Sequence, residues 1–277
     1  MNELEMIQNA PVGVFDSGLG GLTVVREIIR ELPDENIVYF GDTARVPYGC
    51  KSKDTIIHYT EQILNFLKTK KVKAIVVACN TVSAYALESV RAKVDVPIIG
   101  VVKPGARVAT KATKNRRIGV IGTEGTVRSG MYAEYIHELD PSVLVFQKPC
   151  PLFVPLVEEG MWEDPVMTEM AKRYTAVLKE ENVDTLIMGC THYPLIRKTL
   201  QEVMGDEITL VNPAHETALE LRKVLNEKGI ARGINAPVSR EPYRFYVSDG
   251  PERFHDFASR VLRFDIPLPT KTDIEAY

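Results

Sequence analysis

The sequence lacks the features that would place it in a membrane, on a nucleic acid or around a structural zinc ion. No apolar run approaches the ~20 residues that a membrane-spanning helix needs. The formal net charge of −3 gives no basic footprint of the kind that nucleic-acid-binding proteins carry. The five histidines are scattered and no Cys-x-x-Cys occurs, so no metal site is expected.

The start of the chain and its few cysteines are informative about the compartment. Residues 1–10 are polar and acidic, without the basic and apolar regions of a signal peptide, which predicts a cytoplasmic protein. Four cysteines in 277 residues are too few for a disulfide scaffold, and a reducing cytosol also disfavours one. We interpret Cys50 and Cys150 as small buried apolar residues without a chemical role.

Apolar runs alternate with amphipathic segments along the chain. The apolar runs predict strands at 12–15, 37–40, 74–78 and 98–102. Apolar residues at helical spacing predict helices at 22–32, 56–67 and 82–94. Near-continuous apolar strands between amphipathic helices are typical of a parallel sheet covered on both faces.

The same order recurs in the second half of the chain. Strands are predicted at 117–122, 143–146 and 185–189, with helices at 126–139, at 165–179 and from Leu195 onward. Val-Gly-Val-Phe at 12–15 matches Ile-Gly-Val-Ile at 118–121, and Cys79 matches Cys190 at a slightly larger offset. This pattern indicates an internal duplication, with a repeat too long for a solenoid.

The predicted fold class is α/β, with two similar domains related by pseudo-twofold symmetry. Each domain is a mainly parallel sheet flanked by helices. A helix near Ala214, a strand at 244–247 and a helix after Pro251 are expected to return and complete the first sheet. The first domain is therefore expected to comprise 1–102 plus 213–277, and the second 103–212. We expect the active site in the cleft between them.

Polar residues follow the predicted strands, where ligands bind in open parallel sheets. If the two domains face each other, these strand ends line one cleft. The residues are Asp16, Ser17, Asp42, Thr43, Cys79, Asn80, Thr81, Thr123, Cys190, Thr191 and His192.

Cys79 and Cys190 each end an apolar run and precede a helical pattern. A helix N-terminus favours the thiolate, because free N–H groups and the helix dipole stabilise negative charge. Two thiols that face one carbon from opposite sides can remove a proton and return one to the other face. This predicts a racemase whose paired thiols titrate together and give a bell-shaped pH dependence.

A glycine-rich turn, Asp-Ser-Gly-Leu-Gly-Gly, begins at Asp16. Its glycines allow left-handed backbone and close approach of a ligand, and its N–H groups suit a carboxylate. Thr23 occupies the third glycine position of the dinucleotide motif, which excludes that pattern. His192 is expected to orient or assist Cys190. The apolar stretch 152–157 is interpreted as a loop, followed by a solvated acidic turn at Glu158 and Glu159.

Five motifs, in order along 11–250, together resemble the glutamate racemases of the aspartate/glutamate racemase family. They are Phe-Asp-Ser-Gly-Leu-Gly-Gly-Leu-Thr-Val, Gly-Asp-Thr-Ala-Arg-Val-Pro-Tyr-Gly, Ala-Cys-Asn-Thr, Ile-Gly-Val-Ile-Gly-Thr and Gly-Cys-Thr-His-Tyr-Pro-Leu. The resemblance implies interconversion of L- and D-glutamate without a cofactor, supply of D-glutamate for peptidoglycan, and a homodimer.

The resemblance also implies roles for individual residues. Cys79 would deprotonate D-glutamate and Cys190 would deprotonate L-glutamate. The groups that tune the thiols would be Asp16, Asp42, Glu158 and His192. The glutamate-binding residues would be Asp16, Ser17, Tyr48, Gly49, Asn80, Thr81, Thr123, Thr191 and His192.

Three other functions remain open from the residues. An aspartate racemase would use the same pair of thiols. A thiol redox protein would join Cys79 and Cys190 in a reversible disulfide, although it lacks the usual Cys-x-x-Cys. A sensor would bind a small carboxylate without turning it over.

Overall fold

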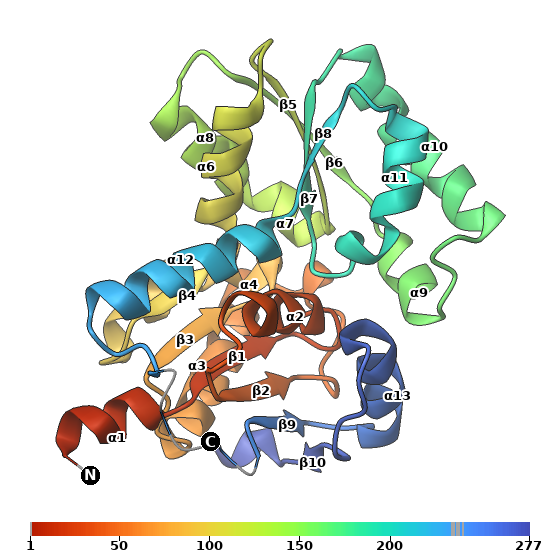
Figure 1. Ribbon diagram of the computed structural model, residues 1–277. Helices are drawn as coiled ribbons and strands as arrows, with labels where there is room; N and C mark the ends of the chain where they lie inside the picture. Colours follow the sequence, from red (N-terminus) through yellow and green to blue (C-terminus); the bar gives the residue numbers. More distant parts are fainter. Residues whose placement is uncertain (1, 234–235, 237–238, 240) are drawn as a thin grey trace.

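The computed structural model describes residues 2–233, 236, 239 and 241–277, which form two parallel sheets placed one above the other in Figure 1. The first sheet has the order β10-β9-β2-β1-β3-β4 and the second has the order β6-β5-β7-β8. The strands of the first sheet are β1 (Val12–Asp16), β2 (Ile37–Gly41), β3 (Ala74–Val77), β4 (Ile98–Gly100), β9 (Tyr243–Val247) and β10 (Thr270–Lys271). Those of the second are β5 (Arg117–Gly122), β6 (Leu144–Pro149), β7 (Thr185–Gly189) and β8 (Thr209–Val211).

The strand orders repeat as the predicted duplication requires. The order β2-β1-β3-β4 in the first sheet corresponds to β6-β5-β7-β8 in the second, and all strand pairs between described residues are parallel. β9 pairs with β2, so the C-terminal segment completes the first sheet as expected. The predicted α/β fold class, with two helix-flanked parallel sheets, is confirmed.

Helices cover both sheets, and α12 runs between them in Figure 1. They are α1 (Glu3–Asn9), α2 (Leu22–Glu31), α3 (Lys53–Thr69), α4 (Asn80–Tyr85), α5 (Leu87–Val90), α6 (Val102–Ala112), α7 (Glu124–Ser129), α8 (Met131–Leu139), α9 (Phe153–Glu158), α10 (Pro165–Glu180), α11 (Arg197–Met204), α12 (Pro213–Glu227) and α13 (Pro251–Leu262). Short 3₁₀ turns occupy Tyr48–Cys50, Arg91–Lys93, Tyr193–Ile196 and Ile274–Ala276.

Several predicted boundaries are wrong. The helix expected over 126–139 is divided at Gly130, whose φ of 70° a glycine adopts without steric cost. The helix expected over 82–94 is divided at Ala86 into α4 and α5, and ends in a 3₁₀ turn. The helix expected from Leu195 starts at Arg197, after a 3₁₀ turn.

Five helices and strands were not predicted: α1, α6, α9, β8 and β10. The stretch 152–157, interpreted as a loop, contains α9, and Pro155 lies in the first turn of this helix. Pro104 and Gly105 likewise lie in the first turns of α6. Proline is tolerated there because the N–H that it removes has no acceptor within the helix. Because of these prolines, the sequence pattern did not predict α6 and α9.

The buried core continues from one sheet to the other. One cluster of buried side chains contains Val14 and Val76 of the first sheet and Leu186 and Met188 of the second. Such side chains each contribute about 1.5–3 kcal/mol when fully buried. No helix within the described part of the chain is long and apolar enough to cross a membrane.

Candidate active site

A cavity of about 530 Å³ lies where the carboxyl ends of the strands in the two sheets meet. Eleven of the predicted site residues line it: Ser17, Tyr48, Gly49, Cys79, Asn80, Thr81, Thr123, Glu158, Cys190, Thr191 and His192. The structure therefore brings together residues from the segments after β1, β2, β3, β5, β6 and β7. Asp16 and Asp42 are also buried, but neither lies on the cavity wall.

Cys79 follows β3 and occupies the N-cap position of α4. Its Sγ lies 3.5 Å from Ser17 Oγ, to which the thiol donates. Burial raises the pKa of Cys79 to about 12, and the negative charge of Asp16 contributes in the same direction. The predicted stabilisation of a thiolate by the helix is thus outweighed, because α4 is one short helix and the thiol is only 5% exposed.

Cys190 follows β7 directly, but no α-helix begins there. A 3₁₀ turn follows instead, so the predicted helix N-terminus is wrong for this thiol. The imidazole of His192 takes the place of the helix N-terminus as the group next to the thiol, with its Nδ1 3.8 Å from Cys190 Sγ. The expectation that His192 assists Cys190 therefore has a geometric basis.

His192 is held on its other side by Glu158, with 3.1 Å between Nε2 and Glu158 Oε1. Burial lowers the pKa of His192, but hydrogen bonds to Cys190 and Glu158 outweigh it and raise the pKa to about 10. The raised pKa favours the protonated, positively charged form of His192. A cation at this position favours negative charge on the neighbouring sulfur.

Glu158 ends α9 and is not part of a solvated turn, contrary to the interpretation of its sequence. Its side chain is 19% exposed, and Oε2 lies 3.1 Å from Arg253 Nη2. Burial raises the pKa of Glu158, but His192 and Arg253 more than offset this and lower it overall. Arg253 lines the cavity from α13, a segment in which the sequence offered no motif.

Asp16 ends β1 and is fully buried. Its Oδ2 accepts a hydrogen bond from the Gly18 N–H at 3.0 Å, whereas Oδ1 has no partner among the described residues. Burial raises the pKa of Asp16, against the positive charge of His192 and nearby backbone N–H groups. A buried carboxyl with a raised pKa is able to hold or release a proton next to Cys79.

The glycine-rich turn serves close packing rather than left-handed backbone. Gly18, Gly20 and Gly21 are absent from the positive-φ residues found in the described chain. A Cβ on Gly20 would lie 2.3 Å from Thr191 Oγ1 and 2.5 Å from His192 Nδ1. Only glycine fits at this contact, so the turn after β1 is pressed against the loop after β7.

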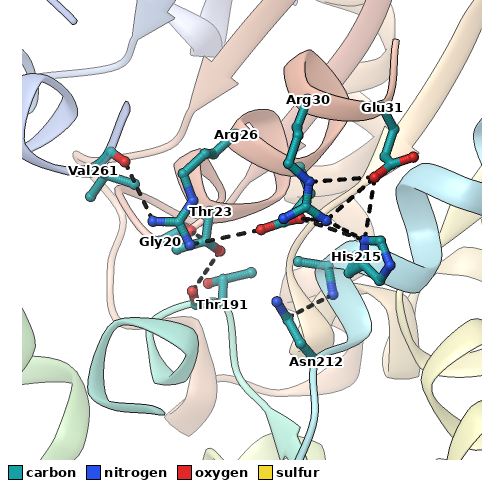
Figure 2. A network of polar contacts seen from close by, with 11 residues as sticks. Gly20, Thr23, Arg26, Arg30, Glu31, Thr191, Asn212, His215 and Val261 are labelled. Atoms are coloured by element: carbon teal, nitrogen blue, oxygen red, sulfur yellow. Dashed lines mark hydrogen bonds and ion pairs between the residues drawn. The ribbon is translucent and has the colours of Figure 1, made fainter. Parts of the chain in front are cut away.

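Helix α2, which follows this turn, is hydrogen-bonded to the loop after β7 and to α12. Thr23 Oγ1 donates to the carbonyl oxygen of Thr191 at 2.7 Å, and Figure 2 shows the two threonines side by side. Arg30 donates to His215 Nδ1 of α12 at 2.7 Å, next to Glu31. α2 therefore fixes the loop that carries Cys190 relative to the first sheet.

Tyr48 and Asp42 form a second buried group. The Tyr48 hydroxyl donates to Asp42 Oδ2, and Arg45 Nε lies 2.7 Å from the same oxygen. Ser248 donates to Oδ1 at 2.9 Å. Burial and the adjacent Asp42 raise the pKa of Tyr48 well above its usual value. Asp42 thus holds Tyr48 at the cavity wall and contacts neither thiol.

Polar side chains of α4 are bonded to helices of the second sheet. Thr81 Oγ1 lies 2.9 Å from Thr123 Oγ1, at the start of α7. Asn80 Oδ1 accepts a hydrogen bond from the Tyr132 hydroxyl of α8 at 2.7 Å. Sequence reasoning missed Tyr132, because nothing in the local pattern distinguishes it from a core aromatic residue.

All four cysteines line the same cavity. Cys150 is buried as expected, and burial raises its pKa. Cys50 is exposed, so its interpretation as a buried residue is wrong. All four are free thiols. Within the described residues, no group of three or more His, Cys, Asp or Glu side chains is arranged to hold a metal ion.

Two thiols at equivalent strand ends of duplicated parallel sheets define an α/β acid–base site suited to proton transfer at carbon. One thiol has a buried carboxyl behind it and the other an imidazolium. The family model of Asp/Glu/Hydantoin racemase matches residues 12–221. The chain belongs to this family.

Similar proteins extend the comparison to most of the chain. A glutamate racemase from Geobacter metallireducens is 47% identical over 252 residues, which cover 91% of this chain and 92% of that protein. A glutamate racemase from Francisella tularensis, whose structure was solved in complex with D-glutamate, is 36% identical in sequence and has a TM-score of 0.90. The match covers 98% of this chain and 100% of that one. A glutamate racemase from Bacillus anthracis has a TM-score of 0.88 at 40% identity, with coverage of 95% and 100%. An aspartate racemase from Picrophilus torridus, 15% identical with a TM-score of 0.58, shares the fold.

Proposed function

We propose that the protein is a glutamate racemase, in which Cys79 and Cys190 transfer protons on opposite faces of the α-carbon. The observation that carries the proposal is that both thiols line one cavity, each from the strand ends of a different sheet. The high identity to glutamate racemases over nine-tenths of the chain supports glutamate as the substrate.

In the L-to-D direction, the Cys190 thiolate takes the α-proton as the C–H bond breaks and an S–H bond forms. The electron pair left behind spreads into the α-carboxylate, where polar groups around the cavity stabilise the developing charge. The Cys79 thiol then donates its proton to the opposite face. The reverse direction exchanges the roles of the two sulfurs.

The protonation states favour this starting arrangement. His192, with its pKa raised to about 10, is positively charged beside Cys190. Cys79, with its pKa raised to about 12, retains its proton. The resting protein is thus prepared for L-glutamate. Asp16 interacts electrostatically with Cys79, and its negative charge helps Cys79 to retain its proton.

The remaining roles follow the same division. Glu158 holds His192, and His192 assists proton transfer at Cys190. Asp42 acts indirectly, by holding Tyr48 at the cavity wall. The glutamate-binding side chains and backbone groups are those of Ser17, Tyr48, Gly49, Asn80, Thr81, Thr123, Thr191 and His192. Asp16 was also expected to bind glutamate, but it does not line the cavity, and its role is to act on Cys79 and His192. We further infer two domains, 1–102 with 213–277 and 103–212, each built on one sheet. We also infer that the protein is a cytoplasmic homodimer that supplies D-glutamate for peptidoglycan.

Circular dichroism of the purified protein with D-glutamate, and no added cofactor, tests this function. The optical signal is expected to decay to zero as L-glutamate forms. Binding of glutamate without decay would favour the sensor, and decay with L-aspartate alone would favour the aspartate racemase. A thiol count that falls by two on mild oxidation, in a protein without racemase activity, would favour the redox function.

The rate is expected to depend on pH, with an alkaline limb. The His192 pKa is raised from its usual 6.5 to about 10, so its positive charge beside Cys190 persists through neutral pH and is lost as pH rises through about 10. Racemisation measured between about pH 6 and pH 10 should therefore fall at the upper end, as His192 loses its proton. A flat profile over this range would contradict the assignment.

Tyr132→Phe is expected to raise the KM for glutamate roughly fivefold, the equivalent of about 1 kcal/mol for one hydrogen bond. The Tyr132 hydroxyl occupies Asn80 Oδ1 and so orients this amide at the cavity wall. Steady-state kinetics in both directions measure the effect. Tyr135→Phe is the control, because Tyr135 lies on the same helix with Lys103 Nζ 4.6 Å from its ring centroid. Equal changes in both variants would contradict this role.

A further inference from the structure

Arg253 bridges the mouth of the cavity between elements that belong to different sheets. It lies on α13, whose Phe254 packs against Tyr39 of β2 with 5.5 Å between the ring centroids. Its partners, Glu158 and Glu159, come after β6 at the end of α9. Arg253 Nη2 lies 3.1 Å from Glu158 Oε2 and 3.6 Å from Glu159 Oε1.

The ion pair continues inward as a chain of contacts that ends at a thiol. The other carboxylate oxygen of Glu158, Oε1, lies 3.1 Å from His192 Nε2. His192 Nδ1 lies 3.8 Å from Cys190 Sγ. The side chains become less exposed from the surface inward: Arg253 is 62% exposed, Glu158 19% and His192 7%. An exposed cation is thereby connected through two side chains to a buried sulfur.

The charges at the mouth make this cation distinctive. Among the described residues that line the cavity, Arg253 is the one arginine or lysine, whereas Glu124, Glu158 and Glu159 are carboxylates. Three charged groups surround Glu158: His192 in the loop after β7, Arg253 on α13, and Glu159, which follows it in the chain. Asp16 in turn interacts electrostatically with His192. Without Arg253, Glu158 would keep a like charge beside it and lose the contact that fixes Oε2.

We propose that Arg253 is a positioning residue for the Cys190 half of the reaction. It anchors Glu158 across the cavity mouth, which directs Oε1 at His192 and keeps the imidazolium against Cys190. The proposal rests on the function proposed above and assigns to α13 a part in it.

An exposed ion pair by itself contributes little to stability, so a structural role for Arg253 predicts almost no effect on catalysis. The same helix offers a matched comparison. Arg260 lies two turns further along α13, and a Cβ on Gly160 would be 2.9 Å from its Nη1. Arg260 therefore also approaches the end of α9, but it forms no ion pair with a described carboxylate and does not line the cavity.

The kinetic test compares Arg253→Gln, Arg253→Lys and Arg260→Gln. In Arg253→Gln we expect kcat to fall roughly 10- to 100-fold, the size of effect that misplaced catalytic groups produce. Because Arg253 lowers the pKa of Glu158, its loss should also move the acid limb of the pH profile to higher pH. Arg253→Lys should restore part of the rate, and Arg260→Gln should match the unmodified protein.

A second measurement does not depend on racemase activity. Each protein is treated with iodoacetamide at several pH values, and alkylation of the Cys190 and Cys79 peptides is followed by mass spectrometry. Arg253→Gln should slow alkylation of Cys190 at least several-fold at neutral pH, relative to Cys79 in the same sample. If this occurs in a protein that does not racemise glutamate, the role of Arg253 stands and the proposed function fails. Unchanged Cys190 alkylation together with an unchanged pH profile would overturn the role of Arg253.

Discussion

Cys190→Ala is expected to abolish racemisation while D-glutamate still exchanges its α-proton with solvent. In the proposed mechanism, the remaining thiol, Cys79, faces the side of the α-carbon from which the proton of D-glutamate is removed. It can take that proton and return a deuteron from D₂O to the same face, but nothing on the other face can complete the inversion. Loss of one acid–base group corresponds to a rate decrease of about 10²–10⁴-fold, and inversion should fall at least this far.

Cys79→Ala should give the mirror-image result, with exchange of L-glutamate and no inversion. Proton NMR in D₂O follows the loss of the α-proton signal, and circular dichroism follows inversion in parallel samples. Cys50→Ala is the matched control, because this exposed thiol lines the same cavity, whereas its hydrogen bond is to the Pro47 carbonyl oxygen. Exchange of both enantiomers in either variant, or full activity in Cys79→Ala or Cys190→Ala, would contradict the assignment.

The position of both thiols was predictable because it depends on local patterns. Apolar runs ending at Cys79 and Cys190 fix the ends of β3 and β7, and the shared order of elements predicts that these strands are equivalent. Parallel sheets place the residues that follow such strands at one edge. The duplicated sequence pattern was therefore sufficient to predict both the fold and the place of the cavity.

The electrostatic environment of the thiols was not predictable in the same way. Helix N-termini were expected to favour both thiolates, yet burial dominates at Cys79 and no helix starts at Cys190. Arg253 and Tyr132 are distant in sequence from the residues that they contact, and no local pattern marks them. Their roles depend on how elements of the two sheets meet, which only the tertiary structure specifies.

The two halves of the site are equivalent in position but differ in chemistry, and thermodynamics limits how this difference is expressed. L- and D-glutamate have equal free energies in water, so the equilibrium constant is one. The ratio kcat/KM must then be equal in the two directions for every variant. Differences between Cys79 and Cys190 can appear only in the separate values of kcat and KM, or in which proton transfer limits the rate.

His192→Gln shows this difference most directly, and we expect it to lower kcat in both directions about 10²-fold. Loss of the imidazolium removes the cation 3.8 Å from Cys190 Sγ and leaves the partners of Cys79 in place. Proton transfer at Cys190 should therefore become more rate-limiting. In the L-to-D direction this transfer breaks the C–H bond of the substrate, whereas in the D-to-L direction it delivers a solvent-derived proton.

Isotope effects should consequently move in opposite senses in His192→Gln. With α-deuterated L-glutamate the substrate isotope effect should rise, and with α-deuterated D-glutamate it should fall while the effect of D₂O rises. Both are measured from initial rates by circular dichroism, with His58→Gln on the exposed face of α3 as the control. Parallel changes in the two directions would mean that His192 supports both thiols equally. Opposite changes would assign it to Cys190, and would show that a cation assists one of the two thiols and not the other.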